Sequence, residues 1–172
     1  MQALHKNIGK ARKYSIYKEF KTMIKILFIC HGNICRSTMA QSVMQHFVDE
    51  MGVSTEFYID SAATSREEIG NGPHHGTVSE LQKHNIPVVP HRARQMTASD
   101  YEDFDYLIGM NSANIRNMNQ IAGGDPEDKI YKMMSFTGSS EDVDDPWYTG
   151  DFSGVYRQIS APCEALLKQL RN

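Results

Sequence analysis

Short apolar runs alternate along the chain with segments in which apolar residues recur every three or four positions. This pattern predicts that strands and helices alternate. The apolar residues from Ile24 to Ile29, interrupted by Lys25, are typical of an interior strand, which we place at residues 24–30. Further strands are predicted at 55–61, 104–110 and 129–136. With right-handed crossovers, this order gives an α/β fold: a four-stranded, mostly parallel sheet with helices on both faces.

Apolar positions spaced three and four residues apart predict the helices. One helix is expected over 37–51 and ends at Gly52, and another over 112–121 with Asn111 as its N-cap. A last helix places Cys163 on its apolar face, so we expect this cysteine in the core. Pro162 predicts a kink in that helix or a late start.

Length and composition favour one globular domain. The chain has 172 residues, of which 40% are hydrophobic, and we assign the domain to residues 23–172. No apolar run is long enough to span a bilayer, and the first residues lack the apolar core of a secretory signal. We therefore expect no membrane partner; the oligomeric state is left open.

The formal charge of -3 conceals a basic start and an acidic body. Residues 1–22 carry six Lys or Arg and one acid, whereas the rest, with 12 basic and 20 acidic residues, has a charge of -8. A basic leader can bind acidic membranes or nucleic acid, or act as a transit peptide. We favour a disordered extension or an upstream start codon, because Met23 directly precedes the first strand, and we expect no nucleic-acid partner.

The three cysteines, at positions 30, 35 and 163, are too few for a disulfide framework. Two of them share one short loop, which favours reactive or structural thiols in a reducing compartment, by default the cytoplasm. No spacing of the seven histidines resembles a metal site, and we expect neither metal nor cofactor.

The loop that joins the first strand to the first helix carries the candidate chemistry. A helix N-terminus and the guanidinium of Arg36 would stabilise a thiolate at Cys30. Gly32 and Asn33 tolerate the positive φ that a cradle of backbone N–H groups requires. The predicted phosphate-binding residues are His31, Gly32, Asn33, Ile34, Cys35, Arg36 and Ser37. Spacing alone leaves a buried structural cysteine as the alternative for Cys30, and the chain has no "GK[ST]" Walker loop.

The acidic loop "SSEDVDDPWYTGDF" at 139–152 supplies a candidate acid. Most of its carboxylates fit a solvated surface turn. Asp145 differs because Pro146 favours an extended backbone before it, and the aromatic rings of Trp147 and Tyr148 can wall a pocket around the carboxyl group.

From Met23 onward the chain resembles the low-molecular-weight protein tyrosine phosphatases. The most specific match is "CHGNICRS"; "DSAATS" at 60–65, "IGNGP" at 69–73, "HRAR" at 91–94, "FDYLIGMNSAN" at 104–114 and "DPWY" at 145–148 follow in the family's order. The resemblance implies hydrolysis of phosphotyrosine proteins or small aryl phosphates through a phosphocysteine, without a metal.

The resemblance also implies roles for individual residues. Cys30 would be the nucleophile, Arg36 the phosphate ligand and Asp145 the general acid, while Ser37 eases departure of the thiolate. Asn33, Ser61 and His91 would hold the loop in shape. Glu67 and Glu68 fall where the family often has an aromatic pocket wall, and with Trp147 and Tyr148 they would line the substrate pocket.

The sequence departs from the family at three further positions. His31 stands where an aliphatic or small residue is more usual, Thr38 replaces a common proline, and Asn111 replaces a common aspartate. His31 either adds positive charge near the anion or faces solvent, and we favour the second interpretation.

Two other functions remain alternatives at this point. A thiol-dependent arsenate reductase shares this architecture but needs further reactive cysteines, and only Cys163 lies outside the loop. A phosphocarrier whose cysteine also ends the first strand would need neither Arg36 nor Asp145.

Overall fold

The computed structural model describes residues 23–172, in which four strands form one sheet. The strands are β1 (Ile24–Cys30), β2 (Phe57–Ala63), β3 (Tyr106–Gly109) and β4 (Ile130–Lys132). They lie in the order β2-β1-β3-β4, and every neighbouring pair is parallel. The predicted α/β sheet is confirmed. The disordered extension expected at 1–22 lies outside the described residues.

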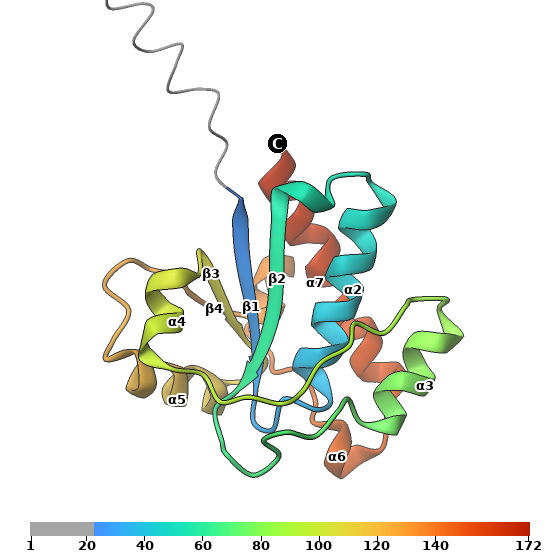
Figure 1. Cartoon of the computed structure of the whole chain (residues 1–172), viewed down its shortest axis with the longest axis horizontal. Coiled ribbons are helices and arrows are strands. Elements are labelled where there is room, and N and C mark those ends of the chain that lie inside the picture. The colour runs from blue at the N-terminus through green and yellow to red at the C-terminus, as the bar shows by residue number, and fades with distance from the viewer. Residues whose placement is uncertain (1–22) are drawn as a thin grey trace, which may run out of the picture.

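Helices cover both faces of this sheet (Figure 1). On one face lie α2 (Arg36–Glu50), α3 (His75–Lys83) and α7 (Phe152–Arg171); on the other lie α4 (Ala98–Asp103) and α5 (Ser112–Ala122). The short helix α6 (Pro146–Thr149) leads into α7, and the 3-10 turns η1 (Ser54–Glu56) and η2 (Met133–Thr137) precede β2 and follow β4. None of the helices within 23–172 combines the length and apolarity of a transmembrane span.

Strand β1 is the centre of the core because its side chains alternate between the two faces. Ile26 and Phe28 belong to the cluster shared with α2 and α7, whereas Leu27 and Ile29 belong to the cluster on the α4 and α5 side. All four side chains are completely buried. This two-sided burial explains why the sequence is uninterruptedly apolar over 26–30.

Three predicted elements need correction. The strand expected at 129–136 ends at Lys132, because the chain then turns into η2, where Met133 is buried in the core. The strand expected at 55–61 lies at 57–63, since η1 occupies 54–56. The last helix has no late start: Asp151 caps it by accepting a hydrogen bond from Gly154 N, and it runs through Pro162.

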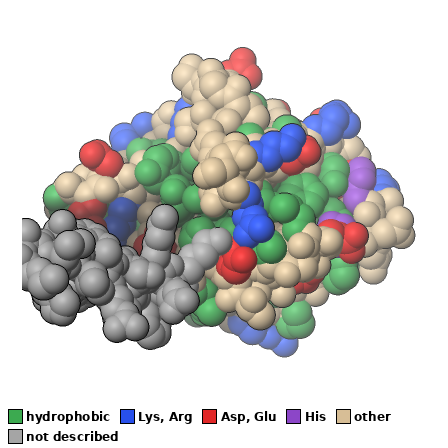
Figure 2. Space-filling model, turned by 90° about the horizontal axis from the view of Figure 1, so that it is seen from above, with side chains coloured by type: hydrophobic (Ala, Val, Ile, Leu, Met, Phe, Trp, Pro, Cys, Tyr) green, Lys and Arg blue, Asp and Glu red, His purple; other side chains and the backbone are tan. Residues whose placement is uncertain are grey.

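The carboxyl ends of parallel strands lie at one edge of a sheet, and the loop after β1 lies there together with α6 (Figure 1). Open α/β sheets usually bind ligands at this edge. The opposite end of the molecule, seen in Figure 2, carries acidic, basic and apolar side chains interspersed.

Candidate active site

The loop between β1 and α2 wraps around the Cys30 thiol. Cys30 is the last residue of β1, and its Sγ lies 3.0 Å from Ser37 Oγ in the first turn of α2. Asn33 has a φ of 59° and donates from its backbone N to the same sulfur at 3.3 Å. The sulfur therefore sits at a helix N-terminus with donors around it, an arrangement that stabilises a thiolate.

The carbonyl groups of the loop are turned away from the sulfur toward other segments. Thr64 N and Ser65 N donate to the carbonyls of Cys30 and His31 at 2.9 and 3.0 Å. His74 N donates to Ile34 O at 2.7 Å, and Thr77 Oγ1 donates to Cys35 O at 3.1 Å. Since these carbonyls point outward, the backbone N–H groups of the loop can face its concave side, where an oxyanion would bind.

Thr38, which stands where the resembled family commonly has a proline, also holds this loop. Its Oγ1 donates to Ile34 O at 2.9 Å and to Cys35 O at 3.1 Å. These bonds fix two loop carbonyls from the first turn of α2, so the hydroxyl supplies by hydrogen bonding a restraint that a proline ring would supply sterically.

The side chain of Asn33 is completely buried and makes four hydrogen bonds. Its Nδ2 donates to Ser37 Oγ and Ser61 Oγ, each at 2.9 Å. Its Oδ1 accepts from His91 Nε2 at 2.7 Å and from Arg94 N at 3.1 Å. Saturation of both amide atoms holds the unusual backbone conformation of Asn33 in place.

His91 supports this network from the edge of the pocket. Burial lowers the pKa of His91 and outweighs the nearby carboxylate of Asp60, whose Oδ1 lies 3.7 Å from His91 Nδ1. A neutral imidazole with its proton on Nε2 donates to Asn33 Oδ1. Ser61 Oγ completes the network by donating to Gln41 Oε1 at 2.6 Å.

Arg36 and Asp145 face each other across the floor of the pocket. The Arg36 side chain is 2% exposed, and its guanidinium donates to Val143 O and to Asp145 Oδ2, each at 3.2 Å. Asp145 is also the N-cap of α6, because its Oδ1 accepts from Trp147 N at 3.0 Å. A cation and a carboxyl group therefore lie beside one thiol.

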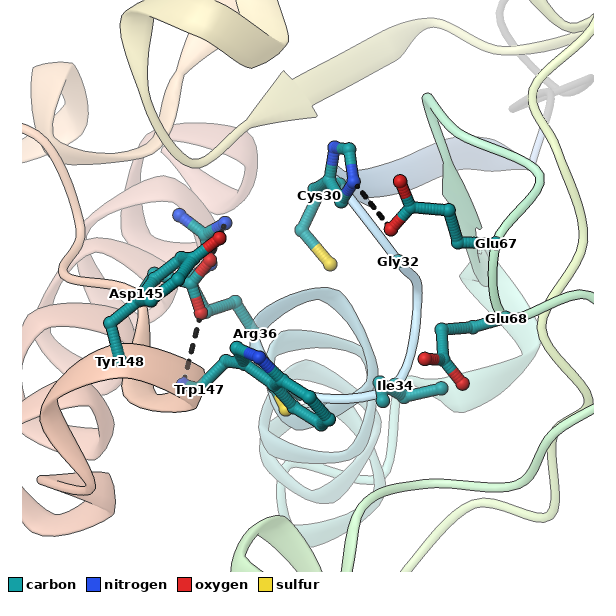
Figure 3. A pocket seen from close by; sticks show the side chains of 11 residues that line it. Cys30, Gly32, Ile34, Arg36, Glu67, Glu68, Asp145, Trp147 and Tyr148 are labelled. Atoms are coloured by element: carbon teal, nitrogen blue, oxygen red, sulfur yellow. Dashed lines mark hydrogen bonds and ion pairs between the residues drawn. The ribbon is translucent and has the colours of Figure 1, made fainter.

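These groups open into a pocket of about 400 Å³. Figure 3 shows Glu67 and Glu68 on one side and Trp147 and Tyr148 on the other. The aromatic residues are strongly exposed, by 60% and 84%. His31 lies 52% exposed at the same rim, with Nε2 3.0 Å from Glu67 Oε2, so it faces a carboxylate as well as solvent.

The structure brings the sequence-predicted site residues together, some lining the pocket and others behind the loop after β1. The pocket is lined by Cys30, His31, Gly32, Ile34, Cys35, Arg36, Glu67, Glu68, Asp145, Trp147 and Tyr148. Asn33, Ser37, Ser61 and His91 lie behind the loop in the hydrogen-bond network. Sequence reasoning missed Thr77, His74 and Arg94, which hold the loop from distant segments; for Arg94 the "HRAR" motif was a signal, and for Thr77 there was none.

The three cysteines differ in environment. Cys35 lines the pocket next to Cys30, and burial, together with the electrostatic effect of the neighbouring Cys30, raises the pKa of Cys35 to about 12. Cys163 is completely buried in the core, where desolvation raises the pKa of its thiol, as its place on the apolar face of the last helix predicted. A second reactive thiol for an arsenate reductase is thus not offered by Cys163.

Comparison with known proteins identifies the family of this chain. The model of the low molecular weight phosphotyrosine protein phosphatase family matches residues 25–172. The chain belongs to this family. The matched residues include the loop after β1 and all of the sheet except Ile24, so the resemblance found in the sequence is confirmed.

Three similar proteins illustrate the match. YfkJ of Bacillus subtilis, a low molecular weight protein-tyrosine-phosphatase, is 37% identical over 87% of this chain and 97% of its own sequence. The crystal structure of YfkJ superposes with a TM-score of 0.83, and the superposition covers 87% of this chain and 96% of YfkJ. An enzyme from Streptococcus pyogenes is 38% identical over 86% and 93%, with a TM-score of 0.77. A Drosophila protein described as an arginine phosphatase is 28% identical over 87% and 99%, with a TM-score of 0.78.

Proposed function

We propose that the protein hydrolyses phosphotyrosine and aryl phosphate monoesters through a phosphocysteine on Cys30, without a metal ion. The observation that carries this proposal is the placement of the Cys30 sulfur 3.0 Å from Ser37 Oγ, in a pocket that Arg36 and Asp145 also line. A phosphocarrier would need neither of the last two residues.

In the first step the Cys30 thiolate attacks the phosphorus atom as the bond to the phenolic oxygen breaks. Arg36 and the loop N–H groups bind the phosphoryl oxygens, whose charge they stabilise in the transition state. Asp145 gives its proton to the departing oxygen, so a phenol leaves rather than a phenolate.

In the second step water attacks the phosphocysteine and the sulfur–phosphorus bond breaks. The Asp145 carboxylate now takes a proton from the water, and inorganic phosphate leaves. Ser37 Oγ donates a hydrogen bond to the sulfur and so stabilises the returning thiolate. The free enzyme is then restored.

The pocket walls support an aromatic substrate. Ile34, Trp147 and Tyr148 present apolar and aromatic surface beside the loop, and such surface stacks well against a phenyl ring. Because the Drosophila relative is described as an arginine phosphatase, phosphoarginine is the competing substrate to test. We expect a higher kcat/KM for phosphotyrosine.

The test is hydrolysis of 4-nitrophenyl phosphate and phosphotyrosine by the reduced protein in the presence of a chelator. Turnover is expected to persist, and Cys30→Ser is expected to abolish it, because a hydroxyl ionises far less readily than a thiol. Rapid acid quench and intact mass spectrometry should detect a phosphoryl adduct on the wild-type enzyme alone.

Cys163→Ala is the matched control, since Cys163 is buried in the core away from the pocket. Its turnover should equal that of the wild type. Turnover by a correctly folded Cys30→Ser, with an unchanged thermal unfolding midpoint, would rule out the covalent mechanism.

A reactive thiol also suits a reducing compartment, and we place the protein in the cytoplasm on that ground. The three cysteines are free in the structure, including Cys30 and Cys35 side by side in one loop. Cell fractionation followed by immunoblotting tests this assignment.

A further inference from the structure

The two sides of the pocket differ in chemistry. One side is the aromatic surface of Trp147 and Tyr148, and the other is formed by the carboxylates of Glu67 and Glu68 (Figure 3). Among the residues that line the pocket, Arg36 is the sole Arg or Lys, and it lies at the floor, engaged with Asp145. The acidic side is therefore not neutralised from within the pocket by a permanent cation.

Both carboxylates are held in place. Glu68 Oε2 accepts from Asn71 Nδ2 at 2.6 Å, and the Glu68 stem packs on the loop, since a Cβ added to Gly32 would lie 3.3 Å from Glu68 Cγ. Glu67 Oε2 lies 3.0 Å from His31 Nε2. The segment that carries both residues is tied to the loop after β1 through Thr64 N and Ser65 N, so the backbone of this segment has a fixed position relative to Cys30.

The local charge around this pair stays negative at neutral pH. Asn71 is uncharged, and His31 balances Glu67 only when its imidazole is protonated. Arg66 precedes the pair but does not line the pocket, and Arg92 donates to Gly70 O outside it. The formal charge of residues 23–172, with 12 basic and 20 acidic residues, is also negative.

We propose that Glu67 and Glu68 select phosphotyrosine sites whose neighbouring residues are basic, an inference that rests on the proposed phosphotyrosine phosphatase activity. With the phosphoryl group at Cys30, the residues next to the phosphotyrosine lie over the rim, where a lysine or arginine meets these carboxylates. An arginine can also stack on the exposed rings of Trp147 and Tyr148. The negative body attracts the same substrates from a distance.

The experiment compares two phosphotyrosine peptides of equal length, one with lysine and arginine on both sides of the phosphotyrosine and one with glutamate there. Each exposed ion pair changes affinity by a few-fold, so two of them predict a kcat/KM ratio of roughly 10 in favour of the basic peptide at low ionic strength. The ratio should decrease as salt is added. In E67Q/E68Q it should fall to about 2.

The matched control is E50Q/E164Q, which removes the same number of negative charges. Glu50 is the last residue of α2, at the end of that helix away from the loop, and Glu164 lies on the exposed side of α7. This variant should keep the wild-type ratio. A fall equal to that in E67Q/E68Q would attribute the selectivity to net charge and overturn the role of the rim.

Free phosphotyrosine separates the two proposals, because it carries no neighbouring residues. Equal kcat/KM values for both peptides, together with hydrolysis of free phosphotyrosine, would overturn the inference and leave the proposed function standing. An unchanged ratio in E67Q/E68Q would overturn it too. Absence of hydrolysis of every phosphotyrosine substrate would overturn the proposed function itself.

Discussion

Both carboxylate oxygens of Asp145 are engaged in the structure, one by Arg36 and the other by Trp147 N. Phosphoryl oxygens that enter the loop compete for the same guanidinium. The bond from Trp147 N is independent of Arg36, so it can hold the carboxyl group in the pocket while the other oxygen turns toward the leaving group. The Asp145 side chain can therefore take one position in the free enzyme and another when a phosphoryl group is bound.

This arrangement leads to a prediction for Asp145→Asn. The rate of phosphocysteine formation from phosphotyrosine should fall by about 10² to 10⁴, the range for loss of one general acid. The deficit should be smaller for 4-nitrophenyl phosphate, because nitrophenolate leaves with little protonation. Single-turnover measurements isolate this step from hydrolysis of the intermediate. Asparagine can still accept from Trp147 N, which preserves the cap.

Asp144→Asn is the matched control, since Asp144 Oδ2 accepts from Gln158 Nε2 at 3.0 Å and does not line the pocket. In Asp144→Asn, any change in the rate of phosphocysteine formation should be the same for phosphotyrosine and 4-nitrophenyl phosphate. Equal deficits for both substrates in Asp145→Asn would instead mean a structural role for Asp145, and Asp144 would become the first candidate acid.

Cys35 leads to a prediction about oxidation. Peroxide converts the Cys30 thiolate to a sulfenic acid, which Cys35 can capture as a disulfide with loss of water. Since the pKa of Cys35 is raised to about 12, it reacts as a minor thiolate form, but its position in the same loop compensates. Mild peroxide should inactivate the wild type reversibly, whereas thiols should restore Cys35→Ser poorly. Equal recovery of both proteins, measured by aryl phosphate hydrolysis, would exclude this role.

Sequence alone pointed to residues whose chemistry depends on local spacing. Cys30, Arg36 and Ser37 are separated by a fixed loop between a strand and a helix, so their proximity follows from their order. Thr77 and Arg94 are different, because each binds one loop atom from a distant segment. Such a contact depends on how α3 and the segment after it pack. The "HRAR" motif marked the segment of Arg94 without showing which loop atom it binds, and no local pattern marked Thr77.

At the scale of elements, local sequence predicts the bounds of β1 but not those of β4. β1 pairs on both sides and is buried on both faces, and its predicted bounds are confirmed. β4 pairs with β3 alone and has three residues, none of them fully buried. The apolar residues that follow it pack as η2 against the core, and the apolar run looks the same in sequence for either structure.

The segment that carries His91 makes stability depend on pH. Burial lowers the pKa of His91 in the folded protein, whereas in the unfolded chain it titrates near 6.5. Below about pH 6.5 the unfolded chain therefore binds a proton that the folded protein does not, and the free energy of unfolding falls as the pH decreases toward the folded pKa. Above about pH 6.5 the contribution of His91 to the free energy of unfolding is fully retained.

We predict that His91→Gln reduces this loss, measured by urea unfolding at pH 7.5 and 5.5, because glutamine can donate to Asn33 Oδ1 without titrating. Part of the slope should remain, since burial and the neighbouring His75 also lower the pKa of His74. A slope in His91→Gln equal to that of the wild type would refute the assignment.

At the scale of the whole molecule, two hydrophobic clusters of the described residues lie on opposite faces of one sheet. β1 contributes to each, so the loop that follows it is anchored by a strand that is buried on both faces of the sheet. This anchoring explains why the loop can hold a positive φ at Asn33 and still present a fixed set of donors. We propose that 23–172 is one phosphatase domain.

The last prediction concerns residues 1–22. β1 begins at Ile24, Met23 is 45% exposed, and the family model matches residues 25–172. A chain that starts at Met23 should therefore keep the thermal unfolding midpoint and the kcat/KM for 4-nitrophenyl phosphate of the full chain. A chain that also lacks 24–26 is the control: it loses the completely buried Ile26, worth about 1.5 to 3 kcal/mol, and three residues of pairing with β2, and should unfold at lower temperature. A large loss of either quantity in the first variant would show that the extension contributes to the domain.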